Sequence, residues 1–514
     1  MCRLIRPLRV AAAVGLVGTF AANLLTAQPP AAAPPGAPPP AAAKEQPAPA
    51  PEKGEKLSPV KVTDAKVEMK TAVDPKPLSD AVKKGLEYLV KSQSEDGGWS
   101  QGGGWRTQGT GGGRVEGKAV EDPSDIGNTC FALLALFRAG NTVTTGEYKD
   151  AVARGLRFVL ARVERADADS LYITDVRGTQ LQSKIGPYID TFLVNLVLAE
   201  MRGTAGPEEK RLVAALEKTM TKIVRHQGAD GGFANNGGWA PTLSMGLCNK
   251  SISRARQNGV EIDRRVLDRA LADGRTAAEG KALATGPAAT TGLAGTAKPG
   301  DPVALAGAVP AAPTAGPALG GRTARFADAG GYGGGGLGGG DAGVKLYSFG
   351  RGAGNTQDAV NGFRVEAAQA KEVLKDAKAT DTQKQEARRT VEKLAEAEKA
   401  NDKVQAGLAA TVRDERFVAG FGSNGGEEFL SFMNISETLV LKGGKDWTDW
   451  DAKMRAGLEK AQDGQGSWSG HHCITGKTFC TSAALLVMLA DRTPFPVDVL
   501  RAQAEKRDPA PKKD

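Results

Sequence analysis

The segment GHHCITGKTFC, residues 470–480, gathers the side chains with the clearest potential for chemistry. It holds His471 and His472, two of the three histidines of the chain, and Cys473 and Cys480, two of its five cysteines. Imidazole and thiolate groups are common ligands of zinc, and a histidine can act as a general acid or base near neutral pH. In an oxidising compartment the two thiols can instead form a disulfide bond. The segment therefore predicts a zinc site, a catalytic histidine pair or a Cys473–Cys480 disulfide, and simple loop packing also accounts for the histidines.

Polar side chains also stand at the starts of several mostly apolar segments. The apolar residues of each segment cover most of a helical circumference, which predicts a buried helix. Four of the segments align on a shared threonine, in GNTCFALLAL at Thr129, YIDTFLVNLVL at Thr191, APTLSMGL at Thr242 and FCTSAALLVML at Thr481. The residues before that threonine are Asn128, Asp190, Pro241 and Cys480, and Glu427 and Glu428 open a similar segment, EEFLSFMNISETLVL. We therefore expect these polar side chains in the first turns of buried helices.

Most of these buried helices are predicted to follow an amphipathic one. In LSDAVKKGLEYLVKS, residues 78–92, apolar side chains recur at helical spacing and Ser79 is placed to cap the first turn. The same order of an amphipathic and then an apolar segment recurs from residues 147, 207 and 447. No such pair can bury its apolar face alone, so the pairs must pack against one another. The apolar helices are then expected inside a ring of the amphipathic ones.

A short motif joins the two helices in three of these pairs. It reads QSEDGGW at 93–99, QGADGGF at 227–233 and QDGQGSW at 462–468. The glycines permit a tight turn, the glutamine can bond exposed helix-end groups, and the aromatic ring can fill the joint between neighbouring pairs. Because the position of Asp96 is Gln465 in the last copy, we assign the acid to the turn and not to catalysis. The motif residues are Gln93, Asp96, Trp99, Gln227, Asp230, Phe233, Gln462 and Trp468.

These three copies resemble the QW repeat of the prenyltransferase and squalene oxidase repeat family. The resemblance covers about residues 78–262 and 417–492. It implies an all-α fold, the α/α toroid, in which inner helices surround a central cavity and outer helices surround the inner ones. In that architecture the inner helices begin at the mouth of the cavity. The resemblance therefore implies that the cavity is lined by Asn128, Asp190, Glu427, Glu428 and Cys480.

The chain matches the catalytic motifs of this superfamily only in part. Terpene cyclases of the second class carry a DxDD motif, and the corresponding stretch here, PYIDT, keeps only Asp190. The acidic run EDPSD at 121–125 is interpreted as a solvated turn. Protein prenyltransferase β subunits hold zinc with Asp, Cys and His ligands, and Cys480 stands at the histidine position of that set. A zinc cofactor would then be held by His472, Cys480 and Glu427, and the candidate catalytic residues are Asp190, His471 and His472.

The rest of the sequence predicts targeting and linking segments. Arginines followed by an apolar run at 1–27 predict a signal peptide for export to the periplasm or the medium. A Pro/Ala-rich linker at 28–56 follows, and the toroid is expected over 57–273 and 414–492. Between its parts we expect a disordered Gly/Ala/Pro-rich insertion at 274–350 and an antiparallel coiled-coil insertion at 357–412. Residues 262–273 are interpreted as an amphipathic helix cut from its partner by the insertion, and residues 493–514 as a charged tail.

Composition narrows the expected partners. The net charge of +8 includes arginines of the predicted signal peptide and is not clustered in a basic stripe, so a nucleic-acid surface is not expected. We expect no permanent membrane span once the signal peptide is removed. The sequence predicts an exported repeat protein whose cavity binds an apolar small molecule or an extended, peptide-like ligand. The alternatives are a divergent cyclase-like or prenyltransferase-like enzyme, and a scaffold that binds a protein partner through the coiled-coil insertion.

Overall fold

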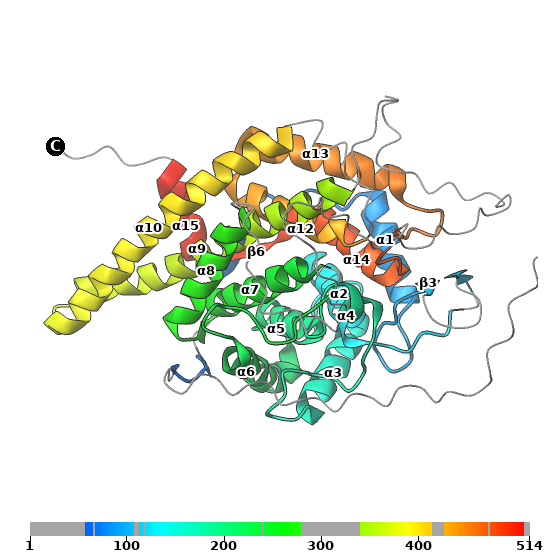
Figure 1. Ribbon diagram of the computed structural model, residues 1–514, viewed down its shortest axis with the longest axis horizontal. Coiled ribbons are helices and arrows are strands. Elements are labelled where there is room, and N and C mark those ends of the chain that lie inside the picture. Colours follow the sequence, from blue (N-terminus) through cyan, green and yellow to red (C-terminus); the bar gives the residue numbers. More distant parts are fainter. Residues whose placement is uncertain are drawn as a thin grey trace, which may run out of the picture. The chain divides into compact units, whose positions relative to one another are not determined.

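The computed structural model describes residues 57–64, 67–106, 113–117, 120–238, 240–278, 340–413, 426–470 and 473–507. This part of the chain is mostly helical, as the sequence predicts (Figure 1). The predicted signal peptide and linker, most of the Gly/Ala/Pro-rich insertion, His471 and His472 lie outside the described residues. No helix among the described residues is both long enough and apolar enough to cross a membrane.

Within the described residues, six helices form a continuous series of packed neighbours, which we call the central helices. Helix α2 packs against α5, α5 against α7, α7 against α9, α9 against α12, and α12 against α14, which packs in turn against α2. The series of contacts therefore returns to its start. In α5 every residue is buried, which explains why its sequence is apolar on all sides. The central helices are α2 (Ile126–Arg138), α5 (Ile189–Met201), α7 (Pro241–Gln257), α9 (Gly340–Lys375), α12 (Glu428–Lys442) and α14 (Lys477–Met488).

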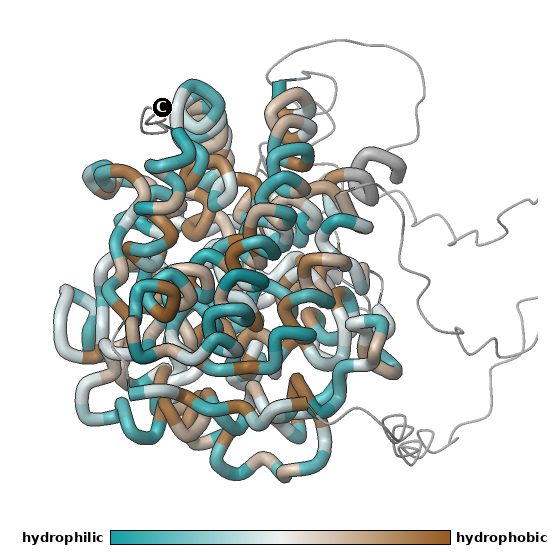
Figure 2. The backbone as a smooth tube through the Cα atoms, turned by 90° about the vertical axis from the view of Figure 1, so that its left-hand side faces the viewer, coloured by the Kyte–Doolittle hydropathy of each residue, from teal (hydrophilic) through white to brown (hydrophobic). Residues whose placement is uncertain are grey.

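Six further helices of the described part, the peripheral helices, each pack on one or two central helices. Helix α1 packs on α14 and α2, α3 on α2, α6 on α5, α8 on α9 and α7, α10 on α9, and α13 on α12 and α14. In Figure 1, α3 and α6 lie outside α2 and α5. Figure 2 shows hydrophilic and hydrophobic residues alternating along the helical turns, as one-sided burial requires. The peripheral helices are α1 (Asp80–Lys91), α3 (Lys149–Arg165), α6 (Glu209–His226), α8 (Arg264–Ala278), α10 (Asp381–Arg413) and α13 (Gly444–Ala461).

Short elements tie distant parts of the chain together. Strand β1 (Lys61–Val62) pairs with β5 (Val260–Glu261), β2 (Met69–Thr71) with β6 (Pro494–Pro496), and β3 (Gly104–Arg106) with β4 (Gly113–Val115), all antiparallel. In the second pair Lys70 lies opposite Phe495, so the segment before α1 is bonded to the segment after α14. The remaining helices of the described residues are α4 (Gln180–Lys184), the 3-10 turns η2 (Gly206–Glu208) and η4 (Ala490–Arg492), and α15 (Val497–Arg507).

The first and last copies of the repeated motif make equivalent bonds. Trp99 Nε1 donates to the Leu89 carbonyl oxygen at 2.7 Å, and Gln93 Nε2 donates to the carbonyl oxygen of Ala151 in α3 at 2.9 Å. In the last copy, Trp468 Nε1 donates to the Leu458 carbonyl oxygen and Gln462 Nε2 to that of Ala81 in α1, both at 2.8 Å. The indole therefore closes the end of its own peripheral helix, and the glutamine holds the first turn of the next peripheral helix.

The turn of the motif depends on a glycine and a neighbouring aspartate. Gly97, Gly231 and Gly466 have φ between +83° and +86°, a region that other residues rarely adopt. Asp96 Oδ1 accepts from the Gly98 amide at 3.0 Å, and Asp230 makes the equivalent bond at 2.9 Å. In the last copy Asp463 takes this role, because its carboxylate accepts from the amides of Gln465 and Ser467. The aspartate is therefore part of the turn in every copy.

The structure differs from the sequence prediction in the second half of the inserted region. Helix α9 begins at Gly340, inside the segment predicted to be disordered, and its residues from 350 to 365 are buried. The reason is close packing of small residues: a Cβ atom on Gly350 or Gly354 would lie 3.0 Å from Ser431 or Asn434 of α12. Helix α9 thus belongs to the central helices and packs on α8, the helix that precedes the insertion. The predicted charged tail likewise contains β6 and α15, in which Phe495 and Val499 are buried.

Candidate functional site

Two buried carboxyl groups meet where α2 and α5 begin. Asp125 caps α2, since its Oδ1 accepts from the Asn128 amide at 2.8 Å and its Oδ2 from Asn128 Nδ2 at 2.7 Å. Asp190 lies in the first turn of α5. Burial, and then the negative charge of Asp125, raise the pKa of Asp190 to about 7, and burial raises the pKa of Asp125 to about 6. We call these two residues the aspartate pair.

The short helix α4 covers the aspartate pair. Gln182 Nε2 donates to Asp190 Oδ2 at 2.6 Å. Thr179 and Gln182 form a capping box that fixes the first turn of α4. On the same helix, Gln180 Oε1 accepts from the backbone amide of Thr475 at 3.1 Å. Helix α4 therefore bridges the aspartate pair and the loop that leads into α14.

Glu427, at the start of α12, is another buried carboxyl group. Its Oε1 accepts from the Tyr347 hydroxyl at 3.2 Å and its Oε2 from the Ile474 amide at 3.3 Å. Burial raises the pKa of Glu427 to about 7, although these hydrogen bonds and one from the Cys473 thiol lower it. Tyr347 comes from α9, so α9, α12 and the loop before α14 meet at this carboxyl group.

The two predicted disulfide cysteines are free thiols. The Cys473 thiol donates to Glu427, whereas Cys480 Sγ lies 3.6 Å from the Ile474 carbonyl oxygen and donates to it. Each thiol therefore has a hydrogen-bond partner of its own, and the predicted Cys473–Cys480 disulfide is not formed. Burial, and then the charge of Glu427, raises the pKa of Cys473 to about 12, so this thiol is protonated at neutral pH.

The described residues contain no group of three or more His, Cys, Asp or Glu side chains placed to hold a metal ion. Of the predicted zinc ligands, Glu427 and Cys480 both lie beside Ile474, and His472 falls outside the described residues. The predicted zinc site therefore stays a prediction, and so do the roles predicted for His471 and His472.

At the other end of the central helices the buried charges are paired. Glu437 of α12 accepts from Arg138 of α2 at 2.5 Å, from Lys250 of α7 at 2.6 Å and from Arg254 of α7 at 3.0 Å. Arg138 also pairs with Glu200 of α5 at 2.7 Å. Lys250 pairs with Asp358 of α9 at 2.7 Å. These six residues, which we call the ionic network, carry three positive and three negative charges and connect five central helices.

The contrast between the two ends identifies the candidate site. In the ionic network, the surrounding cations hold the pKa of Glu437 well below its usual range despite the burial. Asp125, Asp190 and Glu427 form no ion pair with a lysine or arginine in the described part of the chain. Carboxyl groups that burial keeps partly protonated are found more often at functional sites than in purely structural networks. We therefore take the aspartate pair, Glu427 and α4 as the candidate site.

Sequence reasoning found part of this site. Asp190, Asn128 and Glu427 lie at helix starts, with Asn128 bonded to Asp125. Glu428 and Cys480 are buried at the same helix ends. The interpretation of EDPSD as a solvated turn was wrong for its last residue, because Asp125 is only 6% exposed. An aspartate three residues before Asn128 carries a capping signal that could have indicated it. Gln182 and Tyr347 were missed.

Comparison with models of protein families, with curated proteins and with solved structures finds no match to this chain.

Proposed function

We propose that the chain forms an α/α toroid, with the central helices inside and the peripheral helices outside. The closed series of contacts and the matching joints of the first and last motif copies support this arrangement. In chain order the described helices form the pairs α1–α2, α3–α5, α6–α7, α8–α9, α10–α12 and α13–α14. The proposal includes membership of the QW-repeat superfamily and export through the predicted signal peptide.

We further propose that this toroid binds a polar ligand at the end where the central helices begin. The observation that carries the proposal is a set of three buried carboxyl groups that form no ion pair among the described residues. The aspartate pair lies beside α4, and Glu427 contacts the loop that α4 also contacts. At neutral pH such groups are present in both forms, so they can donate hydrogen bonds as well as accept them. Since α4 covers the aspartate pair, ligand entry requires α4 to move.

The interior of the described helices favours a polar ligand over the apolar one that the sequence suggests. Several buried side-chain atoms of the central helices have no hydrogen-bond partner in the described part of the chain. A buried polar atom without a partner costs about 1–3 kcal/mol. A ligand with hydroxyl or amide groups can form hydrogen bonds to these atoms, whereas an apolar ligand would leave them unpaired. At the candidate site these atoms are Asn128 Oδ1 and Asp190 Oδ1.

A general acid–base enzyme is the second candidate function. It is favoured by the proximity of two carboxyl groups whose pKa values are raised to about 6 and about 7. At neutral pH Asp190 is about half protonated and Asp125 is mostly ionised, so Asp190 can give a proton while Asp125 receives one. The cyclase-like alternative assigns the acid to the same residue, Asp190.

Thermal unfolding in the presence of candidate ligands tests the binding proposal. Neutral oligosaccharides, short peptides and polyprenyl alcohols are added separately to the purified chain at neutral pH. We expect an oligosaccharide or peptide to raise the melting temperature, and we expect Asp190→Asn to abolish that shift. The exposed carboxylate of Asp449, changed to Asn, is the control and should leave the shift intact. A shift produced only by the polyprenyl alcohol, or retained in Asp190→Asn, would contradict the proposal.

A further inference from the structure

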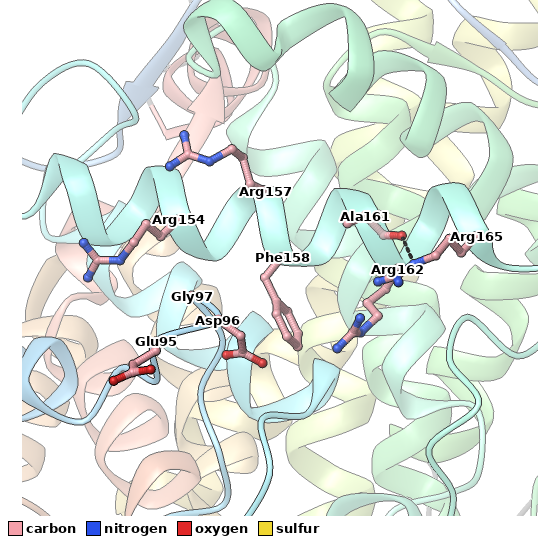
Figure 3. Close-up of a pocket in the computed structure, with 9 residues that line it drawn as sticks. All are labelled: Glu95, Asp96, Gly97, Arg154, Arg157, Phe158, Ala161, Arg162 and Arg165. Atoms are coloured by element: carbon pink, nitrogen blue, oxygen red, sulfur yellow. Dashed lines mark hydrogen bonds between the residues drawn. The ribbon is translucent and has the colours of Figure 1, made fainter.

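The exposed side of α3 carries two adjoining cavities that are separate from the candidate site. The first, of about 340 Å³, lies between α3 and the first motif copy and includes Asp96, Phe158 and Arg162 (Figure 3). The second, of about 220 Å³, lies between the end of α3 and the loop of residues 166–177. Arg162 and Arg165 line both cavities, so the two cavities adjoin. We call the two together the α3 groove.

Arginines dominate this groove, and neutral groups hold them in place. Arg162 lies over the Phe158 ring at 4.6 Å, and Arg177 over the Tyr172 ring at 3.6 Å. Arg165 Nε donates to a backbone carbonyl of α3 at 3.0 Å. Figure 3 shows Phe158 and Arg162 projecting from α3 toward the turn that contains Asp96. The guanidinium groups are therefore positioned without being neutralised.

The described residues supply no carboxylate partner to the arginines at 154, 162, 165 and 177. Elsewhere on the same surface carboxylates do pair with arginine: Arg211 binds Glu164 at 2.8 Å and Glu208 at 2.7 Å. Arg157 lies 3.9 Å from Glu208 and points away from the turn in Figure 3. A row of unpaired, positioned guanidinium groups fits planar anions such as carboxylates, which they can bind through two parallel hydrogen bonds.

The groove also contains acceptors. Glu95 and Asp96 line the first cavity, and Asp167 and Asp175 line the second. These four side chains would repel the carboxylates of an acidic peptide, whose only neutral donors are its backbone amides. A chain of uronic acid sugars presents a carboxylate and several hydroxyl groups on each unit, so its hydroxyls can donate to the acceptors while its carboxylates bind the arginines.

We propose that the α3 groove binds an acidic polysaccharide, a polymer of carboxylate-bearing sugars. This site goes beyond the proposed binding function, because it shares no residue with the aspartate pair or Glu427. The two sites are nevertheless adjacent, since the carbonyl oxygen of Val176 in the groove accepts from Gln182 of α4 at 3.0 Å.

Calorimetric titration of the full chain with polygalacturonate tests this inference. The variant carries Arg162→Gln and Arg165→Gln together. The matched control carries Arg413→Gln and Arg501→Gln, two exposed arginines outside the groove, and so changes the net charge equally. We expect the variant to bind about tenfold more weakly or worse, as the loss of two charge-assisted contacts predicts, and the control to bind like the native chain. Circular dichroism checks that both are folded.

Three results would overturn the assignment. The native chain could fail to bind polygalacturonate at low ionic strength. The control could lose as much affinity as the variant, which would show an effect of net charge alone. Polyglutamate could bind as tightly as polygalacturonate, which would show that the groove selects carboxylates without regard to sugar hydroxyls.

Discussion

Gln462 donates a hydrogen bond to the carbonyl oxygen of Ala81, a residue 381 positions earlier, at 2.8 Å. The same Nε2 atom donates to Gly466 of its own turn at 2.9 Å. One side chain thus fixes the last motif copy and joins the last helix pair to the first. We expect Gln462→Ala to lower the free energy of unfolding by about 1–3 kcal/mol, the usual effect of leaving partly buried backbone groups unpaired. Urea unfolding measures this, with Gln465→Ala in the same turn as the control that should change little.

The aromatic residue of the motif should matter more than the glutamine. Trp99 is fully buried, and its ring packs against Gly155 of α3. We expect Trp99→Ala to cost roughly 3–5 kcal/mol, as for other emptied aromatic sites. Trp99→Phe keeps most of the packing but loses the bond to Leu89, so it should cost less. Equal unfolding free energies for the native chain and Trp99→Ala would show that the ring does not stabilise the joint.

The ionic network should respond strongly to the loss of one charge. Glu437→Gln keeps the shape of the side chain but leaves Arg138, Lys250 and Arg254 with too little negative charge. Removing one partner of a buried ion pair typically costs about 3–5 kcal/mol. The ionised Glu437 should stabilise the folded state fully at pH values above the pKa of glutamate in the unfolded chain. This stabilisation should be lost as the pH falls through the pKa of Glu437 in the folded state, which is lowered. Urea unfolding at neutral pH, with the exposed Asp498→Asn as the control, checks the size of the effect.

The stability that Asp190 contributes should change with pH in the opposite direction to that of Glu437. Because burial raises the pKa of Asp190 to about 7, the folded state binds more protons than the unfolded state between about pH 4 and pH 7. Stability from this group therefore falls as the pH rises through that window. Asp190→Asn cannot ionise, so its melting temperature should fall less than that of the native chain between pH 5 and pH 8. Parallel pH profiles for the two proteins would contradict the assigned pKa.

The sequence predicts the helix pairs well because burial dictates their apolar patterns. The fully apolar stretch around Phe192 and the one-sided stretch around Leu86 lie in a central and a peripheral helix, as their periodicity indicates. The prediction from the sequence failed for α9, because glycines such as Gly350 disfavour a helix on their own. In the structure, these glycines allow α12 to pack closely against α9.

The candidate site was less predictable than the fold. Asp190 could be predicted as a site residue because it precedes Thr191, one of the threonines on which the apolar segments align. Asp125 could not be recognised as its neighbour, because the two lie 65 positions apart and their proximity depends on how α2 packs against α5. In the sequence, Arg138 is recognisable only as a residue in the last turn of a predicted helix. Its partners Glu200 and Glu437 come from other helices, so the ion pairs could not be predicted. Local pattern predicts helices, whereas charge pairing between helices requires the packed structure.

The central claim is that a partly protonated carboxyl pair lies where α2 and α5 begin. Carbon-13 spectroscopy of aspartate side-chain carboxyls, recorded across the pH range, measures it directly. The account predicts one resonance that titrates near pH 7 and a second near pH 6, with the first absent from Asp190→Asn and the second still present near pH 6 in that variant. If every aspartate carboxyl of the native chain titrated below about pH 5, as ordinary exposed aspartates do, the claim would be contradicted.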